Sequence, residues 1–78
     1  MYMKYIIVKD HGRELPYIFP ALLNHDDVVA ALGSPAVASA GIVMFTEQGL
    51  RCSGESMTLG IRSRKGEDST IINEMLGV

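Results

Sequence analysis

Residues 2–19 read YMKYIIVKDHGRELPYIF, in which two β-prone segments flank a short polar turn. Tyr2 to Lys9 is rich in β-branched and aromatic residues, and Glu14 to Phe19 predicts the returning strand. Between them, Gly12 tolerates the positive φ that a tight turn requires. Pro16 has no N–H to donate, so the second strand is predicted to lie at a sheet edge or to carry a bulge. The chain therefore opens with an antiparallel hairpin.

A short helix is predicted after this hairpin. Asn24 is placed to cap the free N–H groups at its start, and Asp26 and Asp27 suit the positive end of the helix dipole. Gly33, followed by Ser34-Pro35, is a strong stop signal, because glycine adopts the left-handed conformation and proline prevents continuation.

Two further extended segments complete the predicted sheet. Ala36 to Thr46 predicts a third strand, and Leu50 to Ser63 predicts extended backbone interrupted at Gly54 by a bulge or a break. The end of this last segment alternates, with one set of side chains on each face of a regular strand. One set is Met57, Leu59 and Ile61, and the other is Ser56, Thr58, Gly60 and Arg62.

The C-terminal residues predict a second helix, capped by Asp68 or Ser69 and ended by Gly77. The predicted order is ββαββ(β)α. It describes a single α+β domain over residues 1–78, with a small antiparallel sheet of four to five strands and two short helices. Two such helices are expected to cover one side of the sheet and leave the other side free.

The composition limits the classes of function. The chain has 78 residues and a net charge of −2, with 47% hydrophobic and 21% charged residues. This length excludes a large cofactor-binding enzyme, and the lack of basic surplus argues against nucleic-acid binding, which depends on counterion release. One cysteine, Cys52, excludes an internal disulfide framework and multi-cysteine zinc motifs. With no signal peptide or membrane span in the sequence, we expect a cytoplasmic protein.

Short motifs that resemble catalytic sites lack essential residues. Gly49–Ser56 has P-loop spacing, but Glu55 occupies the lysine position and reverses the sign of the charge. Gly54–Thr58 begins like a nucleophile elbow, yet Thr58 replaces the second glycine and no histidine follows. We expect no catalytic residues, no cofactor and no enzyme activity.

A catalytic thiolate pair of Cys52 with His11 or His25 forms only if the fold brings the two residues together. A cysteine on an apolar strand face is more often a small buried hydrophobic residue. A metal site at His25-Asp26-Asp27 is disfavoured, because adjacent helical positions diverge by roughly 100°.

The candidate ligand site is the polar face of the last strand. Ser56, Thr58 and Arg62 project to one side of a regular strand, Arg64 follows on the same side, and Arg51 is a further candidate. Hydroxyls and guanidinium groups suit a phosphate or carboxylate. The alternative is an ordinary solvated strand surface, since neighbouring acids partly neutralise the patch.

Apolar residues predict self-association. A chain this small buries only about 60% of its surface, so a monomer is marginal. The Ala36–Met44 segment is apolar on both faces, which indicates that both are covered. We expect a homo-oligomer formed through an uncovered sheet face or through the edge strand that contains Pro16.

Three segments resemble small accessory proteins of temperate phages and prophages. They are Gly12-Arg13-Glu14-Leu15-Pro16, Phe19-Pro20-Ala21-Leu22-Leu23-Asn24-His25, and Cys52-Ser53-Gly54-Glu55-Ser56 with Ser63-Arg64. This resemblance implies stoichiometric binding in the host cytoplasm, by which the protein antagonises a host defence or regulatory factor. The alternative that it implies is a sponge that sequesters an anionic nucleotide signal at a subunit interface, and an enzyme acting on such a ligand is the third class.

Overall fold

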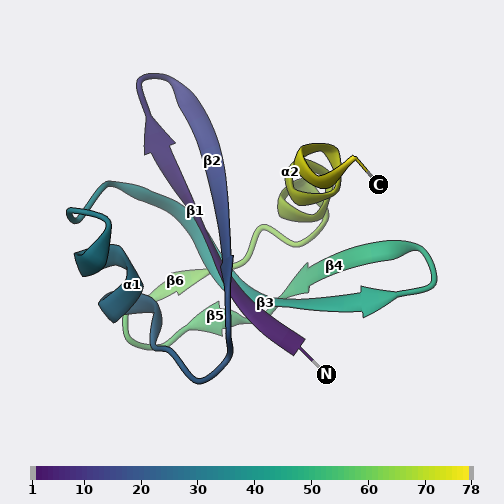
Figure 1. Cartoon of the computed structure of the whole chain (residues 1–78), viewed down its shortest axis with the longest axis horizontal. Coiled ribbons are helices and arrows are strands. Elements are labelled where there is room, and N and C mark those ends of the chain that lie inside the picture. Colours follow the sequence, from purple (N-terminus) through teal and green to yellow (C-terminus); the bar gives the residue numbers. More distant parts are fainter. Residues whose placement is uncertain (1, 78) are drawn as a thin grey trace.

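The structure is a computed structural model and describes residues 2–77. Its elements, in chain order, are β1 (Tyr2–Asp10), β2 (Arg13–Phe19), α1 (His25–Ala31), β3 (Val37–Thr46), β4 (Gly49–Ser53), β5 (Glu55–Ser56), β6 (Ile61–Arg62) and α2 (Gly66–Leu76). Four strands form one antiparallel sheet in the order β2-β1-β3-β4, and β5 and β6 form a separate hairpin (Figure 1). The predicted α+β class is confirmed.

The N-terminal hairpin forms as the sequence predicts. β1 and β2 pair without a register shift from Lys4↔Phe19 to Asp10↔Arg13. His11 and Gly12 take φ values of 51° and 81°, the positive values that a two-residue hairpin turn needs. β1 is also paired with β3 on its other side, so it is a central strand of the sheet.

The two helices cover opposite faces of the sheet, and the prediction that they share one side is wrong. Tyr5 and Ile7 of β1 pack toward Ile72 of α2, whereas Ile6 and Val8 pack with residues of α1 and of the β5–β6 hairpin. All four β1 side chains are at most 3% exposed. Because successive strand residues alternate between faces, an unbroken apolar run requires cover on both. Figure 1 shows α1 and α2 on either side of the crossing strands.

The predicted strand over Leu50 to Ser63 is broken into three pieces. β4 ends at Ser53, and Gly54 adopts a φ of 77°, which confirms the predicted break. Residues 57–60 form a turn rather than a strand, and the Gly60 N–H donates to the Ser56 carbonyl at 2.9 Å. Met57, predicted to share a strand face with Leu59 and Ile61, is 83% exposed in this turn. The alternation of residues 56–62 therefore reflects a tight hairpin.

The helix starts differ in detail from the predictions. Asn24 occupies the N-cap position of α1, but its side chain makes no capping hydrogen bond. Instead, the Asp26 N–H donates to the Thr58 hydroxyl, 3.3 Å away. α2 begins at Gly66 with Lys65 as N-cap, so the prediction of Asp68 or Ser69 as cap is wrong. Asp68 and Ser69 lie within the first helical turn and point into the interior, where both are buried.

The outer edge of β4 is covered by side chains of α2. The Leu50 N–H donates to Asn73 Oδ1 (3.0 Å), and Asn73 Nδ2 donates to the Leu50 carbonyl (2.9 Å). The Cys52 N–H donates to Ser69 Oγ at 2.8 Å. At the opposite edge, Pro16 removes one donor from β2. Because unpaired donors and acceptors at an edge template strand addition, these features disfavour assembly through either edge.

Candidate functional site

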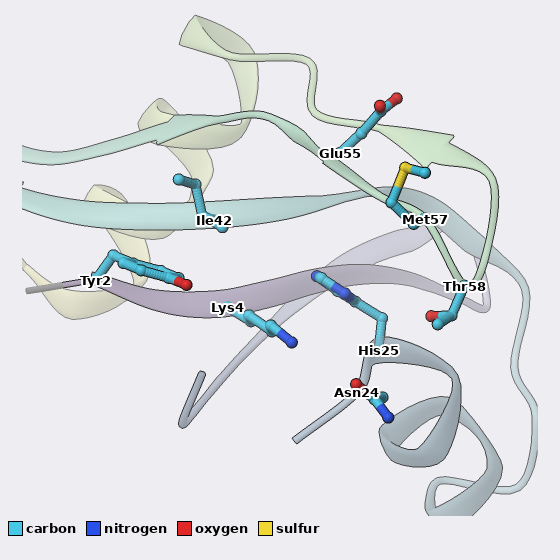
Figure 2. A pocket seen from close by; sticks show the side chains of 8 residues that line it. All are labelled: Tyr2, Lys4, Asn24, His25, Ile42, Glu55, Met57 and Thr58. Carbon is cyan, nitrogen blue, oxygen red and sulfur yellow. The ribbon is translucent and has the colours of Figure 1, made fainter. Parts of the chain in front are cut away.

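A pocket of about 220 Å³ opens on the α1 side of the sheet, and we call it the α1-side pocket. It lies between the start of β1, the start of α1, the middle of β3 and the β5–β6 hairpin (Figure 2). Its lining residues are Tyr2, Lys4, Asn24, His25, Ile42, Glu55, Met57 and Thr58.

His25 forms a rigid wall of this pocket. It is the first residue of α1 and only 5% exposed. Its Nε2 lies 2.9 Å from the Gly41 carbonyl oxygen, and because a carbonyl only accepts, Nε2 carries the proton. The ring also packs edge-on against Phe19, with centroids 5.5 Å apart. Gly41 is required there, because a Cβ at this position would collide with the Ser53 carbonyl oxygen.

Lys4 brings the positive charge of the pocket. It lies on the α1 side of β1, and its Nζ donates to the Leu23 carbonyl at 2.8 Å. Within residues 2–77, no carboxylate lies in salt-bridge contact with this ammonium group. The hydrogen bond to Leu23 fixes the ammonium beside the turn that leads into α1.

Thr58 contributes a hydroxyl whose hydrogen is free to point into the pocket. Ser56 is 1% exposed, and its Oγ accepts the Leu59 N–H at 3.1 Å. The Ser56 hydroxyl also lies 3.3 Å from Thr58 Oγ1. A buried hydroxyl hydrogen needs an acceptor, so Ser56 donates to Thr58. Thr58 Oγ1 also accepts the Asp26 N–H, which leaves its own hydrogen available.

Large apolar side chains surround the entrance. Tyr2 is 47% exposed, Met57 is 83% exposed, and Met44, which pairs with Tyr2 across β1 and β3, is 42% exposed. In Figure 2 the Tyr2 phenol points along the pocket toward Lys4, Ile42 lies on the neighbouring strand β3, and Met57 lies near Thr58. The site thus combines an apolar rim with a few polar groups inside, which is typical of binding pockets.

The arginines predicted to hold an anion do not come together. Arg62 has a side chain 88% exposed and a loose 3.8 Å contact with Glu55. Arg64 instead contacts the carboxylates of Glu14, Glu67 and Asp68 at 2.8–3.0 Å. Arg51 is exposed on β4, opposite Met44 of β3. The prediction of one shared polar face is wrong, because residues 57–60 turn the chain back on itself.

Of the predicted site residues, Thr58 alone lines the α1-side pocket, and Ser56 supports it from beneath. Sequence reasoning missed Tyr2, Lys4 and His25. The signal for Lys4 was present, because it alternates with Ile6 and Val8 and so shares their face of β1. Nothing in the sequence indicated that the β5–β6 hairpin would lie beside it.

The face under α2 holds a cluster of polar groups that we call the α2-side network. Asp68 is fully buried and accepts hydrogen bonds from the Tyr5 hydroxyl, the Ser39 hydroxyl, and the backbone N–H and Nε of Arg64. Burial and the hydrogen bond to Asp68 raise the pKa of Tyr5, and Glu14 and Asp68 raise the pKa of Arg64. The Arg64 guanidinium lowers the pKa of Glu14. Each partner is satisfied, so the network has a structural role.

The structure separates Cys52 from the histidine of the pocket. Cys52 packs in the cluster under α2, whereas His25 lies on the α1 side. Burial raises the pKa of the Cys52 thiol, which disfavours the reactive thiolate. Among residues 2–77, no group of three or more metal-ligating side chains is close enough to hold an ion. Neither helix in the described part of the chain has the length and apolar character needed to cross a bilayer.

Comparisons with protein-family models, with curated proteins and with solved structures find no match to this chain.

Proposed function

We propose that the chain is a non-enzymatic binding protein that associates stoichiometrically with a protein partner through the rim of the α1-side pocket. The observation that carries this proposal is the combination of a small pocket with exposed Tyr2, Met44 and Met57 around it. Exposed apolar side chains beside a pocket are the arrangement that interfaces use for buried anchor residues.

The size of the pocket favours a protein side chain over a nucleotide. The volume of the α1-side pocket is about 220 Å³. Pockets for drug-sized ligands begin at roughly 300 Å³. Arg64, which the nucleotide-sponge hypothesis needs, is already paired with carboxylates. The sponge remains a hypothesis, but the geometry gives it less support than the protein-binding alternative.

The positions of the hydroxyl and thiol groups favour binding over catalysis. The Cys52 thiol is buried, and the hydroxyls of Ser39 and Ser69 are buried and hydrogen-bonded within the α2-side face. His25 uses one ring nitrogen to hold the backbone of β3. A nucleophile activated by an adjacent base needs the two groups within hydrogen-bond reach, and these residues do not meet that requirement.

Self-association and a host target are the finer parts of the proposal. Nine large apolar side chains among residues 2–77 are 41–95% exposed: Tyr2, Leu22, Leu23, Leu32, Met44, Phe45, Met57, Met75 and Leu76. So many exposed apolar groups on a small chain support a homo-oligomer. The resemblance to phage accessory proteins supports a host defence or regulatory protein as the target, met in the cytoplasm.

Light scattering tests self-association, and we expect a mass of at least twice the 8.5 kDa of one chain. A second experiment tests antagonism by expressing the chain in bacteria that carry defined anti-phage defence systems and measuring phage plating. We expect plating to rise with the wild type and with Gln48→Lys, a control at an exposed position in the turn between β3 and β4, and to fall back with Met57→Lys. A monomer that restores no plating, or that converts a nucleotide into product, contradicts the proposal.

A further inference from the structure

We propose that the α1-side pocket binds the carboxylate of an acidic side chain, aspartate or glutamate, that a protein partner presents. This inference rests on the proposed function and adds the chemical class of the group that the pocket recognises. Its basis is one fixed positive charge, a free hydroxyl hydrogen and an apolar wall within a space of side-chain size.

Within residues 2–77, no carboxylate balances the charge of Lys4 in the pocket. One of its three ammonium hydrogens donates to the Leu23 carbonyl, which leaves two for a ligand. The acidic residue in the lining, Glu55, has its carboxylate 3.8 Å from Arg62, and Figure 2 shows it pointing away from Lys4. A partner carboxylate would therefore supply the opposite charge that residues 2–77 do not place there.

Two neutral groups extend this positive site. The Thr58 hydroxyl has its hydrogen free, because its oxygen already accepts from Asp26 and Ser56. The Tyr2 phenol points toward Lys4 from the other end of the pocket in Figure 2. Hydrogen bonds to an ionised acceptor are shorter and stronger than neutral ones, so these donors favour a carboxylate over an uncharged amide.

The dimensions match a short acidic side chain. A pocket of about 220 Å³ is smaller than those that take drug-sized ligands, and a glutamate side chain, with few non-hydrogen atoms, is a group of that smaller class. Ile42, the cross-strand neighbour of Lys4, gives an apolar surface beside the charged side chain, where the methylene groups of such a side chain would lie. The exposed rim of Tyr2 and Met44 would then contact the partner surface around it.

The test is an NMR titration of the full chain with two blocked amino acids, N-acetyl-glutamate N-methylamide and its glutamine counterpart. We expect the glutamate probe to shift the amide signals of Lys4, Asn24 and Thr58, and to bind roughly tenfold or more tightly than the glutamine probe. Lys4→Met should weaken the glutamate probe by a similar factor. Thr58→Val should weaken it less, and Lys9→Met, which removes an exposed lysine from the same strand, should leave it unchanged.

Equal binding of the two probes, or equal weakening by Lys4→Met and Lys9→Met, overturns the inference, and so does the absence of any shift. Butyrate serves as a further probe, and binding of butyrate without binding of the blocked glutamate overturns the assignment to a protein side chain. These outcomes are independent of the mass and plating measurements, so the proposed function can stand when this inference fails.

Discussion

On the α2 side of the sheet the helix is held by hydrogen bonds to a buried carboxylate, whereas on the α1 side the cover consists mainly of apolar contacts. Asp68 of α2 joins Tyr5, Ser39 and Arg64, which come from three other parts of the chain. On the α1 side, Val28 and Val29 pack on the sheet, and one hydrogen bond joins His25 to Gly41.

This difference separates a stabilising face from a binding face. The α2-side network leaves no buried side-chain N or O atom without a partner within residues 2–77, so its groups have no spare capacity for a ligand. The α1 side keeps a pocket, a lysine that has no carboxylate partner among residues 2–77, and exposed methionine side chains. Substitutions on the two faces test this separation of a stabilising face from a binding face, and their expected effects on stability run from large to small.

Asp68→Ala should have the largest effect. This variant removes the carboxylate that accepts four hydrogen bonds. The Tyr5 hydroxyl and the Arg64 guanidinium then lose Asp68 as their acceptor. Breaking a buried charge pair in this way costs about 3–5 kcal/mol in the free energy of unfolding, measured by urea denaturation. Glu47→Ala, in the exposed turn between β3 and β4, is the control and should change it by less than about 0.5 kcal/mol. Equal effects of the two variants would contradict a structural role for the network.

Asn73→Ala should have the second largest effect, because the N–H and carbonyl groups of Leu50 would both lose their partner. We expect a loss of about 1–3 kcal/mol in urea denaturation. Asn24→Ala is the matched control, since the Asn24 side chain makes no capping hydrogen bond, and it should cost much less. A larger loss in the free energy of unfolding for Asn24→Ala than for Asn73→Ala would contradict the view that the α2 side is the stabilising face.

The pH dependence of unfolding should show an alkaline limb from the α2 side. Tyr5 and Cys52 have raised pKa values in the folded state, from ordinary values of 10.0 and 9.0. The unfolded chain therefore releases these protons first, and stability that is present below pH 9 is lost as the pH rises further. Near pH 11 the slope from Tyr5 should approach about 1.4 kcal/mol per pH unit, and Cys52 adds a contribution of the same sign. Tyr5→Phe should remove the tyrosine part of this slope, and Tyr2→Phe should not.

An acid limb of opposite sign is expected from Glu14. Arg64 lowers the pKa of Glu14 below its ordinary value of 4.5 in the folded state. The stability that the ionised Glu14 side chain contributes is present above that pH and is lost as the pH falls below it. The reason is that the Glu14 carboxylate binds a proton more readily in the unfolded chain than in the folded one. Thermal melts between pH 6 and 3 should therefore show a decline that Glu14→Gln reduces.

Met57→Lys should have the smallest effect on stability. Its side chain is 83% exposed in the turn between β5 and β6, so the free energy of unfolding should change by less than about 0.5 kcal/mol. The same variant should weaken partner binding, which the plating assay measures. A large loss of stability would show that the β5–β6 hairpin has a structural role and is not a free rim.

The elements with strong local signals could be predicted. The two β-prone segments around His11-Gly12 form the expected hairpin, and Gly33 and Gly77 follow the helices at left-handed φ values of 86° and 75°. The break at Gly54 is also as predicted, with a φ of 77°. Residues 56–62 form a hairpin and not the predicted strand. A tight hairpin and a regular strand both produce alternating polar and apolar residues over so few positions, so the sequence pattern does not distinguish them.

The candidate site could be predicted only in part. Thr58 was identified, but for its place on a strand face rather than for its contact with the start of α1. Arg64 looked available, because its acidic partner Glu14 lies 50 residues away in the chain. The sequence did not indicate that Lys4 and His25 line the same pocket. Their proximity depends on how α1, which follows β2 in the chain, packs on the sheet.

Outside residues 56–62, the sequence by itself determined where the chain extends, turns and coils, because β-branched residues, glycines and prolines act on the backbone within a few positions. Tertiary structure alone decided which face each helix covers and which charged groups become neighbours. Asp68 shows the reason: as an isolated residue it suits a helix start, but four donors from distant positions make it a buried centre. Contacts between residues far apart in the chain form only when the whole sheet assembles, so they leave no periodic pattern in the sequence.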